Sequence, residues 1–260
     1  MPVASLSYSY YGDTEVSNSS NQSFEYNMSH FSQMALMPIY VGKNDMIMVG
    51  DYASWSTFEI QNGPIDNFEV TSLALPIGWL RQIDPAWQVM AFTAPFGHNS
   101  NLDGAELSGQ LMSGVFARYV KNEKTWWAFG FYSDLNPVES YAIPYLGVFW
   151  TLNEEWSLNL IFPWPSLSYA PNEDWLFSLG LAPSGGSWAI EAEDEEIYYN
   201  MDAWDFSLNA ERRIHEHIWL SIRAGVGGLR SLRITSSGVE DSDFGIDSGW
   251  YFGLKLNIRP

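Results

Sequence analysis

A histidine and a serine two positions apart are the first residues of this 260-residue chain that suggest chemistry. His98 and Ser100 lie in the stretch GHNSN, and alternate residues of an extended strand point to the same side. A histidine base beside a serine hydroxyl can activate that hydroxyl as a nucleophile when a third group orients the imidazole. The sequence assigns no third group, and the same spacing recurs at His30 and Ser32. His98 and Ser100 are therefore either catalytic candidates or ordinary loop residues.

Two acid-rich segments offer carboxylate oxygens, which hard divalent cations prefer. They are EAEDEE, from Glu191 to Glu196, and EDSDFGID, from Glu240 to Asp247. Neither has the spacing of a calcium-binding loop, so they are either solvated outer loops or weak cation sites that bridge to lipopolysaccharide phosphates. His215 and His217 lack an evident third ligand. We therefore predict no dedicated metal site, and nothing in the sequence implies a cofactor.

Isolated charged residues form a third set of candidates for a functional role. Each lies on the polar side of an alternating segment. If these charges pair, they make interior salt bridges; if they remain unpaired around water, they set ion selectivity. The predicted set is Arg118, Glu191, Asp205, Glu211, Arg223 and Lys255.

The elements that position these residues are β-strands, because the dominant period of the sequence is two. The alternation is clearest in WSLNLIF (156–162), WDFSLNAE (204–211), IWLSIRAG (218–225) and WYFGLKLNI (250–258). One face of each segment is apolar, whereas the other carries mainly Ser, Asn and Gly. A water-exposed sheet face usually carries many Lys and Glu, but charged residues are only 17% of this chain. The pattern favours a transmembrane β-barrel over the alternative, a soluble β-sandwich or lectin-like barrel.

Tryptophans that follow short polar turns predict where strands enter the membrane, since aromatic side chains gather at both interfaces. The predicted interface residues are Trp87, Trp126, Trp156, Trp175, Trp219 and Trp250. Short turns are expected near residues 42–45, 81–86, 121–124, 153–155, 171–174 and 214–217. Longer connections lie between them, except for the tight connection PWPS.

These turns predict one all-β domain over residues 1–260, a single antiparallel barrel with about 14 strands by turn count and 12 as the alternative. Short turns are expected on the periplasmic side and longer loops outside. The barrel must close, because an open sheet edge would leave backbone groups unpaired in hydrocarbon.

Composition excludes several classes of protein. Acids outnumber bases 31 to 12, which argues against nucleic-acid binding. The absence of cysteine excludes disulfides and thiolate metal sites. No run of about 18 apolar residues predicts a membrane helix. No leader is visible after Met1, so the chain is either cytoplasmic or a mature exported protein without its signal peptide. The strand pattern favours export.

The segments PIGWLRQIDPAW, YLGVFWTLNEEWSLNLIFPWPSLSYAPNEDWLFSLGL and SGGSWAIE resemble bacterial outer-membrane β-barrels of a family without assigned function. They cover about the central half of the chain. The resemblance implies an outer-membrane location and brings no catalytic residue. Many such barrels end on an aromatic residue that the assembly machinery reads, whereas this chain ends LKLNIRP. Separately, His98 and Ser100 resemble the His-x-Ser arrangement of outer-membrane phospholipase A, which implies lipid hydrolysis.

The function predicted from these observations is a narrow passive pore for ions or small polar solutes, in contact with the lipid bilayer and lipopolysaccharide. The net charge of −19 favours cations. One alternative is a closed barrel that serves a structural or partner-binding role without transport. Another is a lipid-modifying enzyme that uses His98 and Ser100.

Overall fold

The structure is a computed structural model that describes residues 3–18, 23–62, 66–102, 104–105, 107–135, 140–192, 195–236 and 239–259. Side chains are described for these residues except 18, 185–192, 195–200, 202, 229, 234–236 and 239–243. The chain forms strands and connections throughout this part, and no helix in it is long and apolar enough to span a membrane.

The strands alternate in direction around one sheet. The first eight are β1 Ala4–Asn18, β2 Ser23–Val41, β3 Asp45–Gln61, β4 Phe68–Ala74, β5 Ile77–Gln82, β6 Trp87–Ser100, β7 Ser108–Asn122 and β8 Thr125–Leu135. The next eight are β9 Ser140–Thr151, β10 Trp156–Asn159, β11 Ser166–Asn172, β12 Trp175–Ala192, β13 Glu195–His215, β14 Ile218–Ser236, β15 Val239–Ile246 and β16 Gly249–Ile258.

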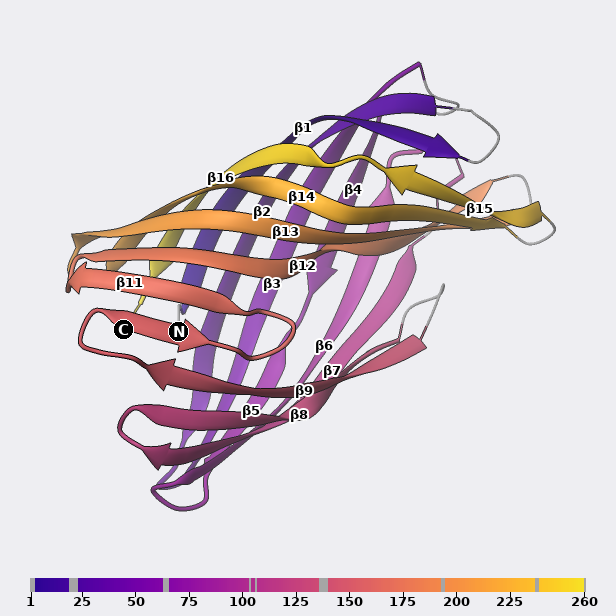
Figure 1. Cartoon of the computed structure of the whole chain (residues 1–260). Helices are drawn as coiled ribbons and strands as arrows, with labels where there is room; N and C mark the ends of the chain where they lie inside the picture. The colour runs from indigo at the N-terminus through magenta and orange to yellow at the C-terminus, as the bar shows by residue number, and fades with distance from the viewer. Residues whose placement is uncertain are drawn as a thin grey trace.

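The sheet closes on itself into a barrel (Figure 1). β4 and β5 together fill one position between β3 and β6, and β15 and β16 together fill one position between β14 and β1. The described strands therefore occupy 14 positions, and β1 pairs with β16 to complete the ring. All neighbouring strands are antiparallel. The predicted closed barrel with 14 strands is confirmed.

The short turns and both chain ends lie at one end of the barrel, which we call the turn end. Turns interrupt the strands at residues 42–44, 83–86, 123–124, 152–155, 173–174 and 216–217, as predicted. The Arg259 N–H donates to the carbonyl of His217, so the last strand also finishes there. The opposite end, the loop end, differs from the prediction in detail. Strand pairing continues into the longer connections expected there, and β15 forms within the connection expected between the segments 218–225 and 250–258.

The outward face of the barrel is apolar, although it is exposed. Leu73, Phe131, Leu179, Leu208 and Ile222 each have more than half of their surface accessible. A belt of this kind in water would be a large aggregating patch, whereas in a bilayer it meets the acyl chains. The alternation that predicted a lipid-facing band therefore holds around the wall.

One hairpin of the wall is much shorter than its neighbours. The alternation in WSLNLIF predicts a strand through Phe162, but β10 ends at Asn159. The Asn159 side chain accepts from the N–H of Ile161 and donates to the carbonyl of Trp164, which folds the chain into a turn. The chain then returns as β11 at Ser166. The sequence predicted this tight connection but not that it lies part-way up the wall.

A carboxylate interrupts the outward apolar belt. Asp51 faces outward between Val49 and Ala53, and its Oδ2 accepts from Gln33 Nε2 at 3.0 Å. Asp51 is the sixth residue after Asp45, where β3 begins, which places it about 15 Å above the turn end for a strand tilted by about 40°. The apolar band is about 25 Å tall, so this carboxylate lies near its middle.

We predict that Asp51→Leu stabilises the folded barrel by about 1–2 kcal/mol, because it removes a charge that faces hydrocarbon. The measurement is the free energy of unfolding in guanidinium with the protein in phospholipid vesicles. Asp51→Asn, which keeps the amide hydrogen bond and loses the charge, should give a smaller gain. A loss of stability in Asp51→Leu would show that Asp51 does not face lipid.

Candidate functional site

The inward face of the barrel is lined by small polar side chains. Cross-strand neighbours place hydroxyls in a nearly unbroken row that begins on β14, passes through Lys255 of β16, and ends at His98 on β6. We call this the serine row, and its members are Ser221, Lys255, Ser7, Ser32, Ser54, Ser72 and His98. Small inward side chains can leave space inside a barrel of this size, and hydroxyls can hydrogen-bond water, although Ser54 and Ser221 are each only 4% accessible.

The predicted lumen charges lie on the inward face where their side chains are described. Arg118, Asp205, Glu211, Arg223 and Lys255 each occupy an inward register position. The side chain of Glu191 lies outside the described residues.

Glu211 shows how one of these charges is held near the turn end. It forms an ion pair with Arg259 and accepts a hydrogen bond from Asn209 at 2.9 Å. The charges are therefore partly paired rather than arranged as a bare ring.

A buried charged and aromatic group lies on the inward face nearer the loop end. Tyr11 donates to Asp205 Oδ2 at 2.8 Å, and Arg230 Nη2 lies 3.6 Å from Asp205 Oδ1. The Arg230 guanidinium also lies over the Tyr11 ring, and Tyr11 stacks on Tyr251 at 5.0 Å. We call these four residues the lumen constriction. Their strands β1, β13, β14 and β16 are neighbours in the ring, so the constriction lies on one side of the wall.

A glycine makes room for the arginine of the constriction. A Cβ at Gly227 would meet the Arg230 guanidinium within 2.5 Å, so any larger residue would displace it. Sequence analysis identified Asp205 but missed its partner Arg230. The pairing depends on two strands that meet only after the barrel has folded.

Apolar side chains pack together on the inward face at the loop end, over the neighbouring strands β15, β1, β2, β3 and β4. Here the two faces of the strands exchange character: the inward residues are apolar and buried, whereas the outward residues between them in sequence are polar. We call this group the outer apolar cluster, and it comprises Val16, Phe24, Tyr26, Phe58, Phe68, Val70, Phe244 and Ile246. Phe58 stacks on Phe68 with ring centroids 4.6 Å apart. The clear alternating segments of the sequence do not include these residues, so the sequence does not predict the cluster.

His98 is inward-facing and belongs to a polar network, but its partner is not Ser100. Its Nδ1 lies 2.8 Å from Ser72 Oγ, and its Nε2 lies 2.8 Å from Gln110 Oε1. Gln110 in turn donates to both carboxylate oxygens of Asp134. Both imidazole nitrogens are thus engaged, and Ser100 instead accepts from the N–H of Leu102. The proposed pairing of His98 with Ser100 is wrong.

The Ser72–His98–Gln110 arrangement has the order of a nucleophile, a base and an orienting group. Acyl transfer also requires N–H donors aimed at the developing oxyanion. Ser72 lies inside a continuous ladder, paired with Ser54 on one side and His98 on the other. Because the ladder uses the backbone N–H groups around Ser72, this network is better suited to bracing the lumen wall than to catalysis.

The six predicted interface tryptophans divide between the two faces. Trp87, Trp156, Trp175 and Trp250 face outward. Trp126 and Trp219 face inward, which corrects the prediction for both. Trp126 stacks on Phe149 and lies under Arg118, whereas Trp219 lies under Arg259. The alternation of their strands decides the direction, and Trp127 takes the outward position next to Trp126.

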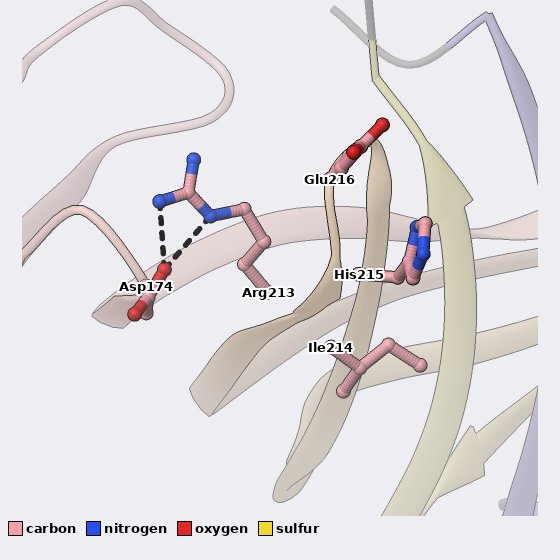
Figure 2. Close-up of a pocket in the computed structure, with 5 residues that line it drawn as sticks. All are labelled: Asp174, Arg213, Ile214, His215 and Glu216. Carbon is pink, nitrogen blue, oxygen red and sulfur yellow. Dashed lines mark hydrogen bonds and ion pairs between the residues drawn. The ribbon is translucent and has the colours of Figure 1, made fainter.

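A shallow pocket at the turn end contains the first of the two turn histidines. Figure 2 shows Arg213 directed at Asp174, with Nη2–Oδ1 at 2.7 Å, whereas His215 and Glu216 lie away from this pair. Among the described residues, no three His, Asp or Glu side chains gather closely enough to hold a metal ion. Two acidic segments, 191–196 and 240–247, are predicted as solvated loops or weak cation sites, and the side chains of 191–196 and of 240–243 lie outside the described residues.

We predict that His98→Ala destabilises the barrel by about 1–3 kcal/mol, because it leaves Gln110 and Ser72 with unsatisfied polar atoms. Ser100→Ala should cost about 1 kcal/mol or less, since Ser100 accepts one long hydrogen bond. Unfolding in guanidinium would compare the two variants. Equal costs, or lipid hydrolysis that Ser100→Ala abolishes, would contradict the network described here.

Comparison with solved structures shows what the fold resembles. The COG4313 outer membrane channel from Pseudomonas putida F1 is 11% identical, with a TM-score of 0.56 over 99% of this chain and 96% of that one. A Pseudomonas aeruginosa FadL homologue is 11% identical, with a TM-score of 0.52 over 98% and 89%. At this identity the likeness shows a shared outer-membrane barrel fold alone. No curated protein matches the sequence. Residues 4–258 match the family described as a domain of unknown function (DUF6268), and the chain belongs to that family.

Proposed function

We propose that this protein is a narrow passive channel of the bacterial outer membrane for ions and small polar solutes. The serine row carries the proposal, because a packed structural barrel has no need of hydroxyls on successive strands around its interior. Hydroxyl groups can replace part of the hydration of a passing solute. The fold, shared with outer-membrane channels, supports the location.

The path is narrow. Ser54, Ser221 and Asn257 face inward, yet each is at most 4% accessible. Nearer the loop end, the Tyr11 and Arg230 side chains reach Asp205 within the constriction. Only small solutes pass such a lumen, and a fixed charge pair at its narrow point acts on every ion that enters.

The outer apolar cluster acts as a gate in this proposal. A short apolar section resists hydrated ions because it loses water easily. The channel should therefore open rarely unless the cluster separates. The same packing is the observation that favours the second candidate function, a closed structural barrel, and conductance distinguishes the two.

Charge changes in the constriction should alter ion selectivity in opposite directions. Arg230→Gln leaves the Asp205 carboxylate unpaired and should favour cations, whereas Asp205→Asn should favour anions. A unit charge about 4 Å from a passing ion changes its energy by about 1 kcal/mol in water, or roughly fivefold in the permeability ratio. The reversal potential across a KCl gradient in a planar bilayer measures this ratio.

The matched control is Arg212→Gln, because Arg212 faces outward over Trp175. It removes the same charge from the chain and should leave the reversal potential unchanged. If Arg212→Gln shifts the potential as much as Arg230→Gln does, selectivity comes from overall charge and the constriction does not line the path.

A polar substitution in the outer apolar cluster should raise the frequency of channel opening. Phe24→Ser places a hydroxyl inside the cluster, whereas Phe31→Ser makes the same change on the outward face of β2. Single-channel records should show more openings for Phe24→Ser than for wild type, and no change for Phe31→Ser. Silence in both variants and in the wild type would favour the closed structural barrel.

A further inference from the structure

The barrel wall is interrupted between β9 and β12. The short β10–β11 hairpin fills the space between them near the turn end only (Figure 1). Its last bonds to the flanking strands are Phe162 N to Leu146 O at 3.3 Å and Leu181 N to Pro165 O at 3.0 Å. Closer to the loop end, no described strand pairs with the facing edges of β9 and β12.

Proline occupies the next position on each of these edges after the last bond to the hairpin. In β9, the carbonyls of Val148 and Leu146 point toward the hairpin. Backbone groups of alternate residues point to the same side of a strand, so Pro144 is the next residue directed at the gap. In β12, Leu181 points toward the hairpin, and Pro183 is the next. Proline has no N–H, so neither edge presents a donor to hydrocarbon at Pro144 or at Pro183.

The hairpin tip satisfies its own polar groups and is apolar outside. Asn159 bonds the Ile161 N–H and the Trp164 carbonyl, and the Trp164 N–H donates to the Ile161 carbonyl. The side chains of Leu160, Phe162 and Trp164 are exposed. A tip of this chemistry is suited to lie within the acyl chains.

The break also lies at the depth of the acyl chains. Phe162 is the sixth residue after Trp156, where β10 begins, so the tip stands about 15 Å above the turn end for a strand tilted by about 40°. The apolar band is about 25 Å tall, which leaves about 10 Å of it beside the interrupted wall.

A series of aromatic rings leads from the lumen to the break. Phe92 of β6 and Phe116 of β7 face inward with ring centroids 5.9 Å apart. Phe116 lies 4.6 Å from Tyr145 of β9, which lies 5.6 Å from Trp164 at the hairpin tip. We call these four residues the ring series. It joins an inward-facing surface to an exposed one beside the two unpaired edges.

We propose that the interruption between β9 and β12 is a lateral portal through which small uncharged apolar molecules pass between the lumen and the hydrocarbon of the membrane. The ring series supplies an apolar surface for them, whereas the serine row suits polar solutes. The proposal rests on the proposed function in one respect, namely that the lumen admits solutes from water. A polar solute would lose its hydration at this exit, so the portal selects apolar ones.

Bridging the two edges should close the portal. The chain contains no cysteine, so Pro144→Cys with Pro183→Cys supplies the only two thiols, and both positions face outward. Bis-maleimides of increasing length would link them, with completeness checked by mass spectrometry. The readout is entry of N-phenyl-1-naphthylamine into vesicles whose outer leaflet is lipopolysaccharide. Bridging should slow entry to the rate of protein-free vesicles, whereas the unbridged double variant stays fast.

The matched control bridges an intact part of the wall. Val115→Cys with Phe131→Cys places two outward thiols on directly paired positions of β7 and β8. Its bridge should leave entry of the probe unchanged. Potassium chloride conductance, measured on every sample, reports the polar path independently and should not change on bridging.

The outcomes separate the two proposals. Unchanged probe entry after complete bridging at Pro144 and Pro183, or equal slowing in the control, overturns the portal while conductance can still support the polar channel. Slowed entry with no conductance in any sample supports the portal and contradicts the polar channel.

A second measurement does not depend on either proline. A bimane label on Ile143→Cys lies on the inward face of β9 at the break, and the same label on Met112→Cys lies on the inward face of the intact wall. Phospholipids with a nitroxide on the acyl chain should quench the first label and spare the second. Equal quenching of both labels would overturn the portal.

Discussion

Hydrocarbon offers no hydrogen-bond partner for the backbone, and this constraint organises the whole molecule. It explains why the sheet closes, with β1 paired to β16, rather than ending in two edges. It also gives significance to the one place where the ring of the described strands is incomplete. Between β9 and β12, Pro144 and Pro183 present no N–H at the next position after the last bonds to the hairpin, and Asn159 satisfies the hairpin tip. The interruption is therefore built into the sequence.

Because the sheet closes, alternate side chains face two different environments, the hydrocarbon outside the barrel and the lumen inside it. The outward ones meet acyl chains, and the inward ones define what can enter the lumen. Charged and aromatic groups line the interior near the turn end, the serine row runs across the strands from β14 to β6, and the constriction around Asp205 and Arg230 lies nearer the loop end. The outer apolar cluster packs on the inward face at the loop end. This order suits a channel that is narrow and seldom open, and the break in the wall gives apolar molecules a different exit.

The sequence predicts what depends on neighbours along the chain and fails where distant strands meet. Period-two alternation and polar turns predicted 14 strands, the six turns and the inward position of Asp205. The same alternation places Trp219 inward, whereas the general preference of tryptophan for membrane interfaces predicts an outward position. His98 was paired with a residue near in sequence, whereas Ser72, its partner, lies one strand away. Arg230 could not be assigned to Asp205 until the register of β13 and β14 was known.

Single-channel recording of the wild-type protein in a planar bilayer tests the central claim most directly. The protein should first show the change in gel mobility on boiling that reports a folded barrel. A polar lumen with an apolar gate predicts discrete, infrequent steps of small conductance. A folded and inserted barrel that stays silent at every voltage would contradict a conducting lumen, and would leave the serine row without a role in transport.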